Sequence, residues 1–237
     1  MYRIPFGLIK RQSGGPPATT VEEERRTPAN SNALIVPKGE PAMSAIEPDL
    51  IRSTVAELAP AFIAVRHTLH ANPELSDHEQ NTAALVAAQL RSLNMDEVRT
   101  GVGGHGVVAT LRGSANGAAK GRTLALRADM DALPIQETAD LPYRSCIPGV
   151  MHACGHDGHT STLLGAAATL GRLRDQIRGT VRFVFQPSEE VVGGAVRMCA
   201  AGAIEGVDAI VALHGWPGLE LRQIGVRSGP SGSNRCR

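Results

Sequence analysis

Short apolar runs alternate with helix-like segments over the second half of this 237-residue chain. Residues 159–173 and 194–201 have the Ala and Leu content and the length of helices. The apolar runs have strand length and lie at 107–111, 123–127, 180–185 and 209–213. Parallel strands need crossover helices between them. The alternation therefore predicts an α/β fold with a central, mostly parallel sheet flanked by helices.

Two helices are predicted ahead of this alternation. Apolar side chains recur every three or four residues from 51 to 69, and Asn72-Pro73 ends the pattern. These apolar positions are Ile51, Val55, Leu58, Phe62, Val65 and Leu69. A second helix is expected over roughly 78–93. Each helix has an apolar side that can pack on the rest of the domain.

Residues 1–43 differ from the rest of the chain. Six prolines, a Gly14-Gly15 pair and the charge run 22–26 interrupt any helical or strand period. We therefore predict a disordered N-terminal extension over residues 1–43. Regular structure is expected just after Met43, and one hypothesis is that translation starts there. N-terminal sequencing of the natural protein would test it.

Charge and hydropathy exclude several classes of protein. Lys and Arg number 24 and Asp and Glu 23, so the net charge is +1, without the basic excess of a dedicated nucleic-acid binder. No apolar run approaches the ~18–20 residues that span a bilayer, and the first residues lack an export signal. The four cysteines do not form a disulfide pattern. We expect no membrane partner, no nucleic acid, and a reducing, cytoplasmic location.

Polar residues follow the predicted strands at the points where the strands end. Asp129 and Asp131 follow the run at 123–127, Glu189 and Glu190 follow 180–185, and His214 follows 209–213. The segment HACGHDGH, with Cys154 and His156, directly precedes a predicted helix. Ligands of α/β sheets bind beyond the carboxyl ends of the strands. Four separate segments are therefore expected to bring Asp, Cys, His and Glu to one edge.

This set of side chains indicates a metal site. Thiolate, imidazole and carboxylate suit Zn²⁺, and also Mn²⁺, Ni²⁺ or Co²⁺. Of the adjacent Glu189 and Glu190, one can bind metal while the other faces a substrate water. Taken singly, each residue also fits a turn, a solvated helix start or a core position. The combination HACGHDGH is much harder to explain in that way.

These segments together resemble the M20 metallopeptidases, in particular their amidohydrolase branch. That branch contains hippurate hydrolase, N-acyl-amino-acid amidohydrolases and the auxin-conjugate hydrolases. The resemblance is carried by RHTLHANPELS (66–76), GVGGHGVVATLRG (101–113), LALRADMDALPIQE (124–137), GVMHACGHDGHTSTLLGAA (149–167), GTVRFVFQPSEE (179–190) and ALHGWP (212–217). The segments run in the order of the family, and MHACGHDGH with QPSEE is the most specific pair.

The resemblance implies roles for individual residues. It makes Glu189 the catalytic base and Asp129 a residue that orients a neighbouring metal ligand. The implied ligands are Cys154, His156, Glu190 and His214, with Cys154 bridging two divalent ions. The implied reaction is metal-dependent hydrolysis of the amide bond of N-acyl amino acids, either hippurate-like compounds or aminoacyl conjugates. The implied fold is a zinc-peptidase-like catalytic domain with an inserted lid domain through which the family dimerises.

The chain departs from this family after ALHGWP, where the lid domain and a last metal-ligand histidine are expected. We therefore predict a partial catalytic domain over residues 44–230 and an aberrant tail over 231–237, with a frameshift or premature stop near Ser231 as a hypothesis. Besides the amidohydrolase, two interpretations stay open. One is a non-catalytic fragment that binds metal or a partner. The other is a cysteine hydrolase that uses Cys154 with His156 or His159.

Overall fold

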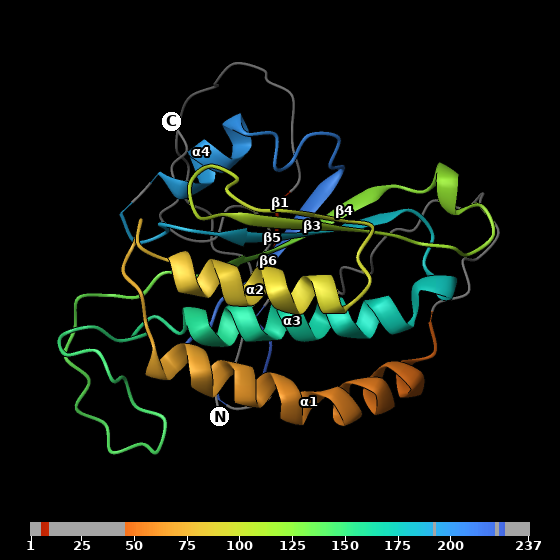
Figure 1. Ribbon diagram of the computed structural model, residues 1–237. Helices are drawn as coiled ribbons and strands as arrows, with labels where there is room; N and C mark the ends of the chain where they lie inside the picture. Colours follow the sequence, from red (N-terminus) through yellow and green to blue (C-terminus); the bar gives the residue numbers. More distant parts are fainter. Residues whose placement is uncertain (1–5, 10–45, 192, 221–222, 226–237) are drawn as a thin grey trace, which may run out of the picture.

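A computed structural model of the chain describes residues 6–9, 46–191, 193–220 and 223–225 (Figure 1). The helices are α1 (Pro48–Ala71), α2 (Gln80–Ser92), α3 (His156–Arg172) and α4 (Gly194–Ala200), with 3₁₀ turns η1 (Ala118–Lys120) and η2 (Arg174–Gln176). The strands are β1 (Phe6–Ile9), β2 (Glu97–Arg99), β3 (Val107–Arg112), β4 (Thr123–Asp129), β5 (Thr180–Gln186) and β6 (Ala209–Leu213). The predicted α/β fold is confirmed, and each strand and helix expected from residue 51 onward is present.

The strands form one sheet in the order β1-β6-β4-β5-β3-β2. Its centre, β6-β4-β5, is parallel, but β3 runs antiparallel to β5, and β2 antiparallel to β3. The sheet is therefore mixed, and the expectation of a mostly parallel sheet holds only for its centre. The cause lies in the lengths of the connections. A short loop links β2 to β3, and residues 113–122, which link β3 to β4, are too few for the crossover between parallel strands, so β3 runs opposite to β4 and β5.

The prediction of disorder over residues 1–43 is wrong for Phe6–Ile9. This segment forms β1, which pairs antiparallel with β6 from Phe6↔Leu213 to Ile9↔Ile210. A strand at the edge of a sheet has unpaired backbone N–H and C=O groups, and the short apolar run Phe-Gly-Leu-Ile can pair with them. The other residues of the predicted extension, including Met43, and the predicted tail at 231–237 lie outside the described part of the chain.

Helices α1, α2 and α3 lie on one side of the sheet and α4 on the other (Figure 1). The larger buried cluster lies between the sheet, α2 and α3, and includes Leu90, Leu164, Phe183 and Phe185. The smaller cluster, on the α4 side, includes Val184 and Met198. Phe183 and Val184 thus face opposite sides, as the period of two in a strand requires. The two-sided burial explains why β5 is an almost continuous apolar run.

Helix α1 packs mainly on α3 rather than on the sheet. As a result only part of its predicted apolar face is covered. Leu69 is buried and Phe62 is partly buried, whereas the side chains of Ile51 and Val55 are exposed. Among the described residues, no helix is long and apolar enough to cross a membrane.

Candidate metal centre

The carboxyl ends of three neighbouring strands and the start of one helix meet at a single edge of the sheet. Asp129 is the last residue of β4, and His214 directly follows β6. Glu189 and Glu190 come shortly after β5, and Cys154 lies in the loop before α3, which begins at His156. Gly155, between Cys154 and His156, has a φ of 87°, which lets the chain turn sharply at this point.

The structure brings all six predicted site residues together. Three groups each have ligand atoms within 4.8 Å of one another: Cys154, His156 and His214; Asp129, His156 and His159; and His156, Glu189 and Glu190. His156 belongs to all three groups, so it stands at the centre of the cluster. The predicted convergence of the four segments is therefore present in the fold.

Two polar atoms of this cluster point to a bound cation. His156 Nε2 and Glu190 Oε1 are buried, have no hydrogen-bond partner among the described residues, and lie 3.6 Å apart. A buried polar atom without a partner costs about 1–3 kcal/mol. A divalent ion that accepts both atoms as ligands would remove this cost, so the residues present fit a metal site.

The ring of His156 is oriented by Asp131. The Nδ1 atom lies 3.2 Å from Asp131 Oδ1. When Nδ1–H donates to this carboxylate, the lone pair of Nε2 is available to bind a metal ion. Burial lowers the pKa of His156, but the hydrogen bond with Asp131 and the negative charges of Asp129 and the Cys154 thiolate outweigh it and raise the pKa to about 11. At such a pKa the His156 ring carries a proton on each nitrogen, and a divalent ion that binds Nε2 would displace the proton there.

Cys154 and His214 face each other. The Sγ atom lies 3.4 Å from His214 Nε2, while His214 Nδ1 donates to the Gly215 carbonyl at 2.7 Å. The neighbouring imidazoles of His156 and His214 lower the pKa of the Cys154 thiol despite its partial burial. A thiol with a lowered pKa is readily converted to the thiolate that binds metal.

Glu189 is suited to accept a proton. Its side chain is half-buried, and burial raises its pKa, with a further contribution from the negative charge of Asp129. A carboxylate whose pKa lies above its ordinary value is a better general base near neutral pH. The neighbouring Glu190 donates its backbone N–H to Asp131 Oδ2 at 3.0 Å.

Asp129 contacts a residue that the sequence analysis gave no metal role. Its Oδ1 atom lies 2.6 Å from His159 Nδ1, and Arg127 donates to Oδ2 at 2.6 Å. The Oδ2 atom of Asp129 lies 3.7 Å from His156 Nε2. The carboxylate that hydrogen-bonds to the predicted ligand His156 is instead that of Asp131. Asp131 lies two residues after the end of β4, and its place beyond a predicted strand was its signal in the sequence.

Both ring nitrogens of His159 are occupied. The Gly215 N–H donates to Nε2 at 2.8 Å, so Nδ1 carries the proton that is donated to Asp129. His159 therefore holds the chain after β6 against β4. In this arrangement it has no free nitrogen with which to activate Cys154, which weighs against a cysteine hydrolase that uses this pair.

A second buried polar network supports the start of α3. His70 lies between two carboxylates, 2.9 Å from Asp157 and 3.0 Å from Glu137, and Arg66 donates to Asp157 at 3.1 Å. These contacts join α1 and the loop after β4 to the residue that follows His156. His70 therefore has a structural role at the start of α3.

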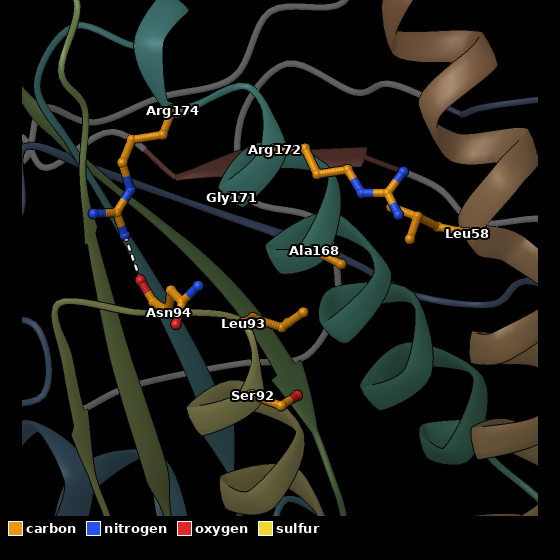
Figure 2. A pocket seen from close by; sticks show the side chains of 8 residues that line it. All are labelled: Leu58, Ser92, Leu93, Asn94, Ala168, Gly171, Arg172 and Arg174. Carbon is orange, nitrogen blue, oxygen red and sulfur yellow. Dashed lines mark hydrogen bonds between the residues drawn. The ribbon is translucent and has the colours of Figure 1, made fainter.

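The pocket in Figure 2 lies away from this cluster. It is lined by Leu58, Ser92, Leu93, Asn94, Ala168, Gly171, Arg172 and Arg174. Ala168, Gly171 and Arg172 lie at the end of α3, whereas the cluster lies at the start of this helix, about 24 Å away along its 17 residues. Arg172 of this pocket pairs with Glu57. Arg174 donates to the Asn94 carbonyl (Figure 2).

An α/β sheet with Cys, His and Glu side chains gathered beyond its central parallel strands has the architecture of an α/β metallohydrolase. Residues 125–229 match the Peptidase family M20/M25/M40. The chain belongs to this family, as the motifs in the sequence predict.

Two curated relatives and one solved structure illustrate the match. The chain is 47% identical over 181 residues to an N-acyl-L-amino acid amidohydrolase of Geobacillus stearothermophilus, and this match covers 76% of this chain and 48% of that protein. It is 42% identical over 174 residues to an N-acetylcysteine deacetylase of Bacillus subtilis, which covers 71% and 43%. This chain thus spans about half the length of the curated relatives it matches.

The solved structure is that of the Bacillus subtilis YXEP protein, described as a dinuclear metal-binding peptidase of the M20 family. It is 39% identical, with a TM-score of 0.58, and the match covers 66% of this chain and 41% of that one.

Proposed function

We propose that this chain provides the metal-binding and proton-transfer groups of an amidohydrolase that cleaves N-acyl amino acids. The observation that carries the proposal is the pair of buried, unpartnered atoms His156 Nε2 and Glu190 Oε1, with Glu189 beside them. A cation site next to a carboxylate of raised pKa is the arrangement that hydrolysis of an amide requires.

Cys154, His156, Glu190 and His214 would hold the metal. The donor set of thiolate, imidazole and carboxylate suits Zn²⁺, Mn²⁺, Ni²⁺ or Co²⁺, and the relative described as a dinuclear metal-binding peptidase supports two ions. When bound, the ions polarise the amide carbonyl and lower the pKa of water. Because Cys154 must remain reduced to act as a ligand, a cytoplasmic location is part of the proposal.

Glu189 would move the proton. It takes a proton from the attacking water and returns it to the nitrogen of the leaving amino acid. Asp131 keeps the ring of His156 in the orientation and tautomer of a ligand, while Asp129 fixes His159. Hydrolysis then releases a carboxylic acid and a free amino acid.

The relatives support N-acyl amino acids as the substrate class, since two of them carry this chemistry in their names. The bound substrate would include both the acyl group and the free carboxylate of the amino acid. Hippurate, N-acetylcysteine and a small panel of N-acetyl amino acids therefore form the test set.

The decisive experiment uses the purified 237-residue chain, stripped with a chelator and reloaded with Mn²⁺ or Zn²⁺. We expect metal-dependent release of amino acid, lost in the chelator and in Glu189→Gln while metal binding persists. Metal binding without turnover on any substrate would favour the non-catalytic alternative. Turnover that survives metal removal would contradict the proposal and support thiol chemistry.

A further inference from the structure

The backbone immediately before Glu189 has an unusual conformation. Ser188 has a φ of 53°, a region that residues other than glycine rarely adopt, and its side chain is completely buried. Such a conformation persists only where the surroundings hold it, and it occurs often at functional sites. Specific contacts must therefore hold Ser188 in this conformation.

The contacts of Ser188 come from the loop between α1 and α2. The Ser188 N–H donates to Glu79 Oε1 at 2.7 Å, and its hydroxyl donates to Asp77 Oδ1, also at 2.7 Å. On the other side of Glu189, the Glu190 N–H donates to Asp131 Oδ2 at 3.0 Å. Glu189 thus lies between two backbone N–H groups that are each fixed by a carboxylate.

Glu79 is the most deeply placed of these carboxylates. Its side chain is fully buried, and its second oxygen, Oε2, has no partner among the described residues. By contrast, more than half of the Asp77 side chain is exposed, so water competes for its bonds. A buried carboxylate is costly to keep in a fold, and packing alone does not require one here.

We propose that Glu79 is a positioning residue for Glu189. By accepting the Ser188 N–H, Glu79 holds the left-handed turn that directs the Glu189 carboxylate toward the cluster around His156. This inference rests on the proposed function, in which Glu189 is the general base. It predicts that loss of Glu79 slows the proton-transfer step without weakening substrate binding.

Glu74 provides a matched control from the same loop. Its carboxylate also accepts backbone N–H groups, from Asn81 at 3.0 Å and Thr82 at 2.7 Å. These bonds stabilise the start of α2, and none of them reaches residues 187–190. A general loss of stability in this loop would therefore affect Glu74→Ala and Glu79→Ala alike.

The experiment compares kcat and KM of the metal-loaded chain with those of Glu79→Ala, Glu79→Gln and Glu74→Ala. We expect Glu79→Ala to lower kcat by about 10- to 100-fold with KM changed less than about threefold, because small misplacements of a reacting group have effects of this size. Glu79→Gln keeps an oxygen for the Ser188 N–H and should restore kcat to within about threefold. Glu74→Ala should leave kcat within the same range. Equal losses in Glu79→Ala and Glu74→Ala, or in Glu79→Gln and Glu79→Ala, would overturn the inference.

Amide hydrogen exchange gives a readout that does not depend on turnover. In Glu79→Ala the Ser188 N–H loses its acceptor, so exchange in peptides covering residues 185–191 should rise about tenfold or more, but not in Glu74→Ala. Should Glu79→Ala fail to fold, Glu79→Asp keeps the charge, shortens the reach by one methylene, and should show the same rise. Unchanged exchange would overturn the inference. A parent chain without turnover but with this exchange pattern would overturn only the proposed function.

Discussion

Asp131→Asn is the substitution that tests the candidate metal centre most sharply. The carboxylate of Asp131 is buried and serves three donors: Oδ1 lies 3.2 Å from His156 Nδ1, and Oδ2 accepts the Ser76 hydroxyl at 2.6 Å and the Glu190 N–H at 3.0 Å. Asparagine has almost the same shape. It replaces one of the two acceptor oxygens by an NH₂ group, which can only donate.

Neither orientation of the new amide satisfies all the donors. With its NH₂ at the position of Oδ2, the Ser76 hydroxyl can rotate and accept, but the Glu190 N–H faces a donor. That buried N–H then costs about 1–3 kcal/mol. With its NH₂ at the position of Oδ1, His156 must accept through Nδ1, and its proton moves to Nε2. The protonated Nε2 can no longer bind metal.

We therefore expect the metal affinity of Asp131→Asn to fall by about 10- to 100-fold, the range measured for residues that orient metal ligands. This corresponds to about 1.4–2.7 kcal/mol. Competition of the folded chain with a chromophoric chelator for Zn²⁺ or Co²⁺ measures the affinity directly. Thermal unfolding of the metal-free chain reports any cost at the Glu190 N–H.

Ser76→Ala is the control, since it removes one donor from Asp131 and leaves both acceptor oxygens in place. It should change the metal affinity by less than about threefold. Asp131→Asn with the affinity and the stability of the parent would refute the reasoning. In that case neither the tautomer of His156 nor the Glu190 N–H would depend on this carboxylate.

Three further measurements test other parts of the structure. Metal at about 100 times its Kd should stabilise the folded chain by about 2.7 kcal/mol, and Cys154→Ser should remove most of this gain at the same concentration in thermal unfolding. Burial opposes ionisation of Asp157, but His70 and Arg66 lower its pKa to about 2. The ionised carboxylate should therefore contribute roughly 2–3 kcal/mol to the free energy of unfolding above pH 4, and this contribution should be lost as the pH falls toward 2. Acid unfolding of Asp157→Asn should lack this loss. Gly194→Ala should destabilise the chain by about 1–3 kcal/mol in urea unfolding, because a Cβ there would overlap the Pro187 carbonyl oxygen; an unchanged midpoint would contradict this close approach.

Much of the fold could be predicted from the sequence because each element carries its own local signal. The almost continuous apolar run of β5 follows from burial on both sides, and Asn72-Pro73 ends α1 where the pattern stops. Strand pairing is different. Whether β3 runs parallel or antiparallel to β5 depends on the length of the connections around it, and the apolar run itself is the same in both cases. The pairing of β1 with β6 depends in the same way on an open edge at the end of the sheet.

In the candidate site too, some residues have a local signal in the sequence and others do not. Asp129, Glu189, Glu190 and His214 could be identified because strand ends meet at one edge. Cys154 and His156 were identified from the HACGHDGH segment, and the individual roles came from the family resemblance. The side chains that hold them in place carry no such signal. Glu79 is 109 positions from Ser188, its hydrogen-bond partner, and His70 is 87 positions from Asp157. A Glu before a helix and a His at the end of one are ordinary in sequence, and only the folded chain shows what they contact.

The loop between α1 and α2 illustrates how much of the site depends on such contacts. Ser76 donates to Asp131, which orients His156, and Glu79 accepts the N–H that precedes Glu189. One short segment, distant in sequence from every predicted ligand, thus supports both the central metal-ligand candidate and the proposed base. Because the two contacts act on different atoms, they can be separated. Asp131→Asn should weaken metal binding, whereas Glu79→Ala should slow turnover at unchanged metal occupancy. A loop that served only to connect the two helices would leave turnover unchanged in Glu79→Ala.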